Sequence, residues 1–174
     1  MAVYFITGKL GAGKTLCAVG RIKEYLQTGR TVATNLDLQL DNMFPETSKQ
    51  SAIRLPDKPR LSDFEDLGKG CIEEDESKYG LIVLDELGTW FNSRNWRDKG
   101  RLDVIDWFLH ARKMHWDIFF IVQSIDSLDG QLVNARFIPT GVGNTPASSR
   151  YDLNVTVHPH GCGEHAVGAG ISNS

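Results

Sequence analysis

The sequence predicts an α/β protein in which a mainly parallel sheet is flanked by helices. Short, continuous apolar runs such as residues 3–6 and 81–84 suit strands that are covered on both faces of a parallel sheet. Stretches with apolar residues at helical spacing separate these runs, and strand–helix alternation is typical of parallel sheets. A glycine-rich segment joins the first apolar run directly to the first helical stretch.

The size and charge of the chain set limits on its class. It has 174 residues, a net charge of −3 and an apolar fraction of 41%, which suit one domain with an appendage. This charge gives no overall attraction to nucleic acid, so any such contact would be local. We expect no signal peptide and no membrane span, because the apolar runs are far too short.

The expected elements follow one another in a regular order along the chain. Strands are expected at residues 3–7, 31–34, 53–55, 81–84 and 118–122. Helices are expected at residues 15–27 and 102–114. A short helix between them has Ser62 and Glu65 as a capping box and Gly68 as its end. The four consecutive acids at 73–76 are interpreted as a solvated loop.

Residues 8–15 carry the motif of a phosphate-binding loop. They read Gly-Lys-Leu-Gly-Ala-Gly-Lys-Thr, between an expected strand and an expected helix. Glycines let the backbone N–H groups wrap a phosphate chain, and the helix directs the positive end of its dipole at the same anion. Lys14 would reach the β- and γ-phosphates, and the Thr15 hydroxyl would hold Mg²⁺. A nucleoside triphosphate is therefore the leading ligand.

Two acids, Asp85 and Glu86, follow the expected strand at 81–84 and give it the form of a Walker B element. The strand would carry them to the carboxyl edge of the sheet, where ligands bind in open α/β folds. Asp85 would hold Mg²⁺ with Thr15, and Glu86 would polarise the attacking water. The alternative is a solvated acidic turn, which the upstream phosphate-binding loop disfavours.

The candidate site residues form two sets. The predicted catalytic residues are Lys14, Asp85 and Glu86, of which Asp85 also binds Mg²⁺ with Thr15. The predicted nucleotide-binding residues are Gly8, Lys9, Gly11, Ala12, Gly13, Lys14, Thr15, Leu16 and Gln123.

Other polar residues leave alternatives open. Gln123 follows the last expected strand, where it senses the γ-phosphate or is an ordinary strand-end amide. Lys9 is a second phosphate ligand or, as we favour, an exposed lysine without a catalytic role. Arg112 is a candidate phosphate sensor. The segment from Trp90 to Arg101 interleaves aromatic residues with arginines, which suits base stacking, an arginine finger or ordinary core anchors.

Four blocks of the sequence resemble the zonular occludens toxin (Zot) family, which includes assembly ATPases of filamentous phages. The blocks lie at residues 1–15, 33–38, 84–92 and 106–113 and follow the order seen in the family. We therefore expect a P-loop ATPase domain at 1–135 and a separate tail at 136–174. The resemblance implies a truncated P-loop NTPase domain that hydrolyses ATP with Mg²⁺ to drive phage assembly and export.

The same resemblance implies partners and a location. Full-length relatives are expected to act as homo-oligomers in the bacterial host cytoplasm, at the inner membrane, with phage coat proteins, phage single-stranded DNA and a secretin. Relatives continue with further sheet, a transmembrane helix and a periplasmic domain, which we do not expect in this chain. Two alternatives remain: a small P-loop kinase acting on a metabolite, and an inactive fragment that only binds nucleotide.

Residues 136–174 differ in character from the rest of the chain. They are rich in small polar residues, glycine and histidine and lack helical periodicity, so we expect an irregular, disordered tail. One DNA sequence can encode residues 136–145 in one frame and 157–165 in another, and it resembles a type I-E CRISPR repeat. We interpret the tail as a translated CRISPR array. The alternative is a metal site made by His158, His160, Cys162 and His165.

Overall fold

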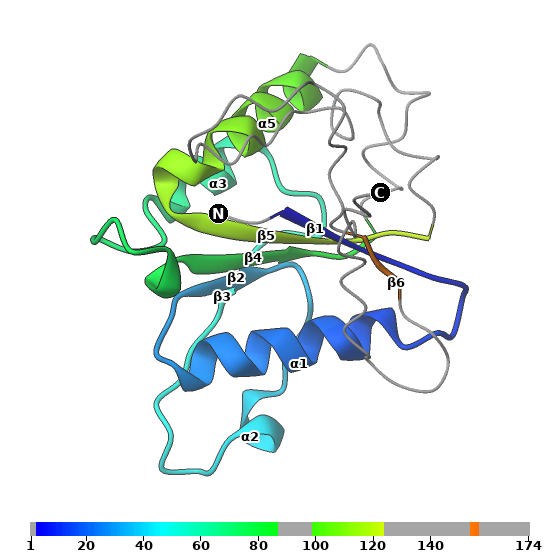
Figure 1. Cartoon of the computed structure of the whole chain (residues 1–174), viewed down its shortest axis with the longest axis vertical. Helices are drawn as coiled ribbons and strands as arrows, with labels where there is room; N and C mark the ends of the chain where they lie inside the picture. The colour runs from blue at the N-terminus through cyan, green and yellow to red at the C-terminus, as the bar shows by residue number, and fades with distance from the viewer. Residues whose placement is uncertain (1–2, 87–98, 124–153, 157–174) are drawn as a thin grey trace, which may run out of the picture.

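Strands and helices alternate in the structure, a computed structural model that describes residues 3–86, 99–123 and 154–156 (Figure 1). The strands are β1 (Val3–Thr7), β2 (Val32–Thr34), β3 (Ile53–Arg54), β4 (Gly80–Leu84), β5 (Trp116–Ile121) and β6 (Asn154–Thr156). The α-helices are α1 (Lys14–Gln27), α2 (Leu40–Met43), α3 (Leu61–Leu67) and α5 (Lys99–His110). Two 3₁₀ segments are η1 (Glu76–Lys78) and η3 (Ala111–Met114).

The strands form one sheet with the order β3-β2-β4-β5-β1-β6, and every neighbouring pair is parallel. Strand β5 lies between β1 and β4, with Val3 opposite Ile118 and Leu84 opposite Phe120. The carboxyl ends of β1, β4 and β5 therefore share one edge of the sheet. The expected mainly parallel sheet is confirmed.

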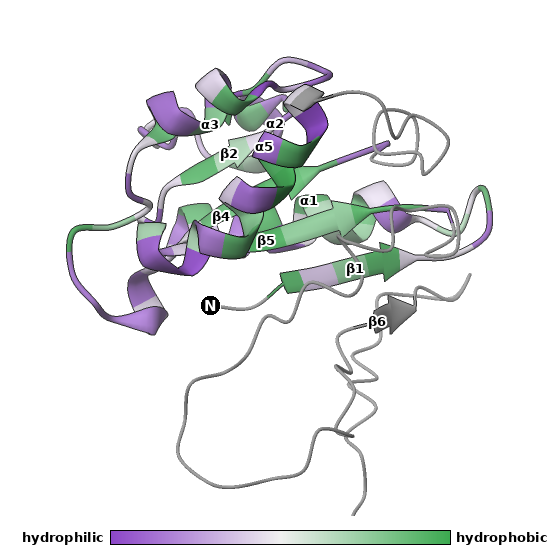
Figure 2. Cartoon of the chain, turned by 90° about the horizontal axis from the view of Figure 1, so that it is seen from above, coloured by the Kyte–Doolittle hydropathy of each residue, from purple (hydrophilic) through white to green (hydrophobic). Residues whose placement is uncertain are grey.

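Helices cover both faces of the sheet, as expected. Figure 1 shows α1 on one face and α3 with α5 on the other. Ile22 and Leu26 of α1 are fully or almost fully buried and belong to the same cluster as Leu81 and Val83 of β4. The central strands are hydrophobic along their length, whereas the helices alternate hydrophobic and hydrophilic residues (Figure 2). Burial on both faces explains why the strand residues form unbroken apolar runs.

The second face is built from aromatic side chains. Phe108 of α5 packs between Phe64 of α3 and Phe120 of β5. The centroid of the Phe108 ring lies 5.1 Å from the centroid of each of the other two rings. Trp116, at the start of β5, is fully buried, and its indole Nε1 donates a hydrogen bond to the Gly68 carbonyl oxygen at 2.9 Å. These contacts attach the excursion between β2 and β4 to the core of the domain.

Two helix boundaries differ from the expected ones. Helix α3 begins at Leu61 after Arg60, so its third residue is Asp63, and the expected capping box of Ser62 and Glu65 is wrong. The Asp63 carboxylate instead accepts a hydrogen bond from the Arg60 N–H at 2.6 Å. The helix expected at 102–114 starts earlier, at residue 99, and its last turn is the 3₁₀ segment η3.

Strand β6 was not predicted from the sequence. It pairs with β1 in parallel register, with Phe5 opposite Asn154 and Thr7 opposite Thr156. A strand of three residues is too short to show the alternating pattern by which strands are predicted. The remainder of the tail lies outside the described residues, including the four candidate metal ligands. The division at residue 135 and the CRISPR origin stay predictions.

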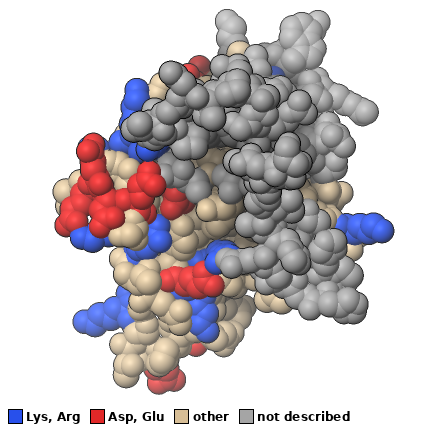
Figure 3. All heavy atoms as spheres, in the orientation of Figure 1, with Lys and Arg blue, Asp and Glu red and all other residues tan. Residues whose placement is uncertain are grey.

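Two acids of the run before β4, Glu73 and Asp75, are bonded within their own segment. Acidic side chains gather at the edge of the molecule where this loop lies (Figure 3). Asp75 accepts a hydrogen bond from the Ser77 N–H at 2.9 Å and also one from the Ser77 hydroxyl, and these bonds lower the pKa of Asp75. Glu73 forms an ion pair with Lys78. These contacts agree with the interpretation of a solvated loop.

The same loop explains why the expected sensor role of Arg112 is wrong. Its guanidinium Nη2 lies 3.3 Å from the Glu76 carboxylate. Residue 112 belongs to η3, which directly precedes β5, so it lies at the amino end of the strands. The two acids that follow β4 lie at the opposite, carboxyl end.

A buried polar network closes the amino end of the sheet. The Asp117 carboxylate of β5 accepts hydrogen bonds from the Tyr25 hydroxyl at 3.0 Å and from Arg30 Nη2 at 3.2 Å. Arg30 Nε also donates to the Tyr79 carbonyl oxygen at 2.6 Å. Burial and the adjacent carboxylate raise the pKa of Tyr25, so its hydroxyl stays protonated and donates. This network ties the end of α1 to β5.

We predict that Arg30→Ala lowers the free energy of unfolding by about 3–5 kcal/mol, because it leaves the buried Asp117 carboxylate without its cation. The matched control is Arg21→Ala, whose exposed pair with Glu24 should contribute at most about 1 kcal/mol. Urea unfolding followed by circular dichroism measures both variants. Equal losses in the two variants would contradict a stabilising role of the buried network.

Candidate functional site

Glycines with positive φ shape the loop between β1 and α1. Gly11 has φ 78° and Gly13, the N-cap of α1, has φ 83°, in the region that side chains other than glycine rarely adopt. The Ala12 N–H donates to the Lys9 carbonyl oxygen at 3.1 Å and closes a turn. The first N–H groups of a helix have no partner within that helix, so the start of α1 suits an anion.

Lys14, the first residue of α1, lies along the loop. Its ammonium Nζ donates to the Gly8 carbonyl oxygen at 2.9 Å and to the Lys9 carbonyl oxygen at 3.0 Å. The Lys9 side chain itself is exposed. The loop thus combines a cation with the N–H groups of a helix start, and both attract phosphate.

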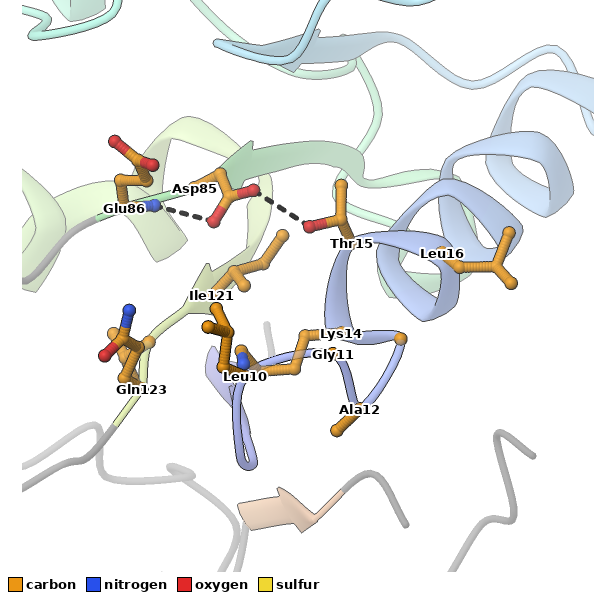
Figure 4. A pocket seen from close by; sticks show the side chains of 12 residues that line it. Leu10, Gly11, Ala12, Lys14, Thr15, Leu16, Asp85, Glu86, Ile121 and Gln123 are labelled. Carbon is orange, nitrogen blue, oxygen red and sulfur yellow. Dashed lines mark hydrogen bonds between the residues drawn. The ribbon is translucent and has the colours of Figure 1, made fainter. Parts of the chain in front are cut away.

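Thr15 and Asp85 join the two predicted motifs directly, although 70 residues separate them in sequence. The Thr15 hydroxyl Oγ1 donates to the Asp85 carboxylate Oδ2 at 3.0 Å (Figure 4). Thr15 lies in the first turn of α1, and Asp85 directly follows β4. A hydroxyl and a carboxylate oxygen are hard ligands, so this pair fits the oxygen chemistry that Mg²⁺ prefers.

The chain leaves β4 in a constrained conformation. The Glu86 N–H donates to the Asp85 carboxylate Oδ1 at 2.7 Å, and Glu86 has φ 55°. A positive φ is uncommon for a residue other than glycine, and such residues occur frequently at functional sites. Glu86 is exposed at this edge. Its carboxylate is therefore accessible to water beside the loop.

Sequence reasoning missed Asn35, which holds the end of β4. Its carboxamide Oδ1 accepts a hydrogen bond from the Asp85 N–H at 2.8 Å, and its Nδ2 donates to the Asp85 carbonyl oxygen at 3.1 Å. Asn35 directly follows β2, the neighbour of β4 in the sheet. A polar residue after an expected parallel strand was the signal that could have identified it.

A cavity of about 510 Å³ lies between the loop and the ends of β4 and β5. It brings together nine predicted residues: Gly11, Ala12, Gly13, Lys14, Thr15, Leu16, Asp85, Glu86 and Gln123. Its wall also includes Leu10, Ile121 and Val122, which were not predicted. Gly8 and Lys9 do not line it and lie under the Lys14 ammonium instead. Figure 4 shows Gln123 on the wall formed by the end of β5.

The other candidate features are either outside the described residues or away from the cavity lining. The residues from Trp90 to Arg97 lie outside the described ranges, whereas Arg101 is buried in α5. Within the described residues, no group of three or more His, Cys, Asp or Glu side chains is arranged to hold a metal ion. None of the described helices is long and apolar enough to cross a membrane.

We predict that Gly13→Ala lowers the free energy of unfolding by about 1–2 kcal/mol, because φ 83° is unfavourable for alanine. No atom lies within 4 Å of the added Cβ, so the loss reports backbone strain alone. The matched control is Gly20→Ala in the interior of α1, where the added Cβ also meets open space. That change should raise stability by about 0.5–1 kcal/mol. Thermal and urea unfolding would show opposite signs; losses in both variants would contradict this account.

Comparison with one solved structure supports the architecture. The genome packaging NTPase B204 from Sulfolobus turreted icosahedral virus 2, in complex with AMP, aligns with TM-score 0.50 and 12% identity. The alignment covers 77% of this chain and 70% of that one, and the likeness shows the fold alone. The N-terminal domain of zonular occludens toxin from Neisseria meningitidis aligns with TM-score 0.48 and 21% identity, over 76% of this chain and 71% of that one.

Sequence relatives are gene 1 proteins of phages. Those of Enterobacteria phage I2-2 and Salmonella phage IKe are 58% and 57% identical over 135 and 139 residues. That of Enterobacteria phage M13 is 53% identical over 140 residues. The matches cover 75–78% of this chain but 37–40% of the relatives, so the chain spans about two fifths of their length. The family model for zonular occludens toxin (Zot) matches residues 2–137, and the chain belongs to this family.

Proposed function

We propose that the chain binds Mg·ATP and hydrolyses it, as the ATPase domain of a phage assembly and export protein. The observation that carries the proposal is the hydrogen bond between Thr15 and Asp85 at the cavity. It joins a phosphate-binding loop to the acids at the end of a buried strand, which is the arrangement that phosphoryl transfer requires. The membership of the Zot family supports the same activity.

The loop would hold the phosphate chain. Its N–H groups and the start of α1 would surround the β-phosphate, because they carry partial positive charge. The Lys14 ammonium would exchange its two carbonyl partners for β- and γ-phosphate oxygens, which are stronger acceptors. Leu16, which follows Thr15 and lines the cavity, would contact the nucleotide next to the phosphates.

The acids would serve the hydrolytic step. Mg²⁺, held by Thr15 and Asp85 when bound, would neutralise charge on the phosphate oxygens. Glu86 would accept the proton of the attacking water, since it lines the cavity and is exposed. Gln123 lines the same cavity from the end of β5 and would orient that water or contact the γ-phosphate.

The cellular setting of the proposal follows from the family. We propose that hydrolysis serves filamentous phage assembly in the host cytoplasm, at the inner membrane, with phage coat proteins, single-stranded DNA and a secretin. Full-length relatives would act as homo-oligomers. A phosphate-release assay without an acceptor distinguishes this ATPase from a small kinase, which needs an acceptor. Nucleotide binding without turnover would identify an inactive fragment.

We predict that Lys14→Ala abolishes Mg·ATP binding, because it removes the cation that the loop would offer to the β- and γ-phosphates. Isothermal titration calorimetry or a fluorescent ATP analogue measures the affinity. The matched control is Lys23→Ala on an exposed position of α1, which should bind as the unaltered chain does. Unchanged affinity in Lys14→Ala would exclude this phosphate site.

We predict that Glu86→Gln retains ATP binding but hydrolyses ATP about 10²- to 10⁴-fold more slowly, because an amide does not accept the proton of the water. Phosphate release under saturating Mg·ATP gives kcat. Glu65→Gln, at an exposed position of α3, is the matched control and should leave kcat unchanged. If Glu86→Gln turned over at the rate of the unaltered chain, another group would have to be the base.

A further inference from the structure

The carboxamide of Asn35 continues the hydrogen-bond ladder between β2 and β4. The backbone pairing of these strands ends with Thr34 opposite Val83. Asn35 then presents one acceptor and one donor to Asp85, the residue that directly follows β4. Its Oδ1 and Nδ2 bond the N–H and the carbonyl oxygen of Asp85, at 2.8 and 3.1 Å. The Asn35 carboxamide thus takes the place of a backbone peptide group of β2. It bonds both the N–H and the carbonyl oxygen of Asp85.

Three hydrogen-bond partners fix the orientation of the Asn35 carboxamide. The same Nδ2 lies 3.3 Å from the Asp57 carbonyl oxygen and donates to it. The Asp85 N–H needs an oxygen as its acceptor, and the carbonyl oxygens of Asp85 and Asp57 need N–H donors. The carboxamide of Asn35 satisfies all three in one orientation only. Asp57 is itself held by Arg54, whose Nη2 lies 2.8 Å from its carboxylate. Asn35 therefore has a second anchor besides Asp85.

The Asp85 side chain depends on this anchored backbone. One carboxylate oxygen accepts the Thr15 hydroxyl at 3.0 Å, and the other accepts the Glu86 N–H at 2.7 Å. Glu86 has φ 55°, which is unfavourable unless neighbouring contacts impose it. If Asn35 were removed, both peptide groups of Asp85 would lose their partner, and the strained residue after it would be free to relax.

We propose that Asn35 is a positioning residue, which orients Asp85 for the metal ion and Glu86 for the attacking water. The inference rests on the proposed function, because it concerns the same site. Asn35 lies outside the residues that line the cavity, so its effect on the ligand passes through Asp85. It should therefore act on the metal-dependent part of binding and on kcat, and not on the contacts of the loop with phosphate.

The test separates metal binding from phosphate binding by the loop, and it uses Mn²⁺ as a spectroscopic substitute for Mg²⁺. The affinity of the full chain for a non-hydrolysable ATP analogue is measured without metal, and Mn²⁺ binding to that complex is followed by electron paramagnetic resonance. In Asn35→Ala we expect Mn²⁺ affinity and kcat to fall about 10- to 100-fold, as for other residues that orient metal ligands. The metal-free affinity should stay unchanged, because Lys14 and the glycine loop are intact. A general structural defect would lower both affinities.

Two further variants control the result. Asn42→Ala removes an exposed amide on α2 that donates to Gln39, and it should leave both affinities unchanged. Asn35→Asp keeps the volume and the acceptor but places an oxygen against the carbonyls of Asp85 and Asp57. It should show the same selective loss even if Asn35→Ala fails to fold by circular dichroism.

The possible outcomes distinguish the inference from the function on which it rests. If the unaltered chain binds nucleotide and needs Glu86 for turnover, but a folded Asn35 variant keeps its Mn²⁺ affinity and kcat, the positioning role is overturned alone. Equal losses of metal-free and metal-dependent affinity would also overturn it. If the unaltered chain binds no nucleotide, the proposed function is overturned, and the inference falls with it.

Discussion

The parallel pairing of β5 with both β1 and β4 is the constraint on which the rest of the structure depends. Because β5 separates these two strands, the phosphate-binding loop and the acids after β4 lie two strand spacings apart, roughly 10 Å. This distance is large enough for a cavity and short enough for the first turn of α1 to reach across it. The Thr15 hydroxyl contacts the Asp85 carboxylate as a result.

The two ends of the sheet have different chemistry. At the amino end, the Asp117 carboxylate is buried and accepts hydrogen bonds from Tyr25 and Arg30. At the carboxyl end, the residues that follow the strands are polar and partly exposed, and the strained Glu86 lies among them. The hydrogen-bonded amino end supports the opposite end, where the side chains of the site must keep precise positions.

Much of the site could be predicted because its two motifs are local in sequence. A glycine pattern between a strand and a helix, and two acids after an apolar run, require no knowledge of distant contacts. Asn35 was missed because its role depends on the adjacency of β2 and β4, which no local pattern encodes. The assignment of Arg112 failed for a different reason: a turn that directly precedes a parallel strand lies at the amino end of the sheet, away from the carboxyl edge where ligands bind.

The sequence by itself determined the fold class, the main strands and helices, and the residues of the loop and of the acidic pair. These features follow from apolar periodicity and backbone preference, which act over a few residues. Only the tertiary structure decided the strand order, the addition of β6 beside β1 and the clamp of Asn35 on Asp85. These depend on hydrogen bonds between segments far apart in the chain, whose geometry is set when the sheet assembles.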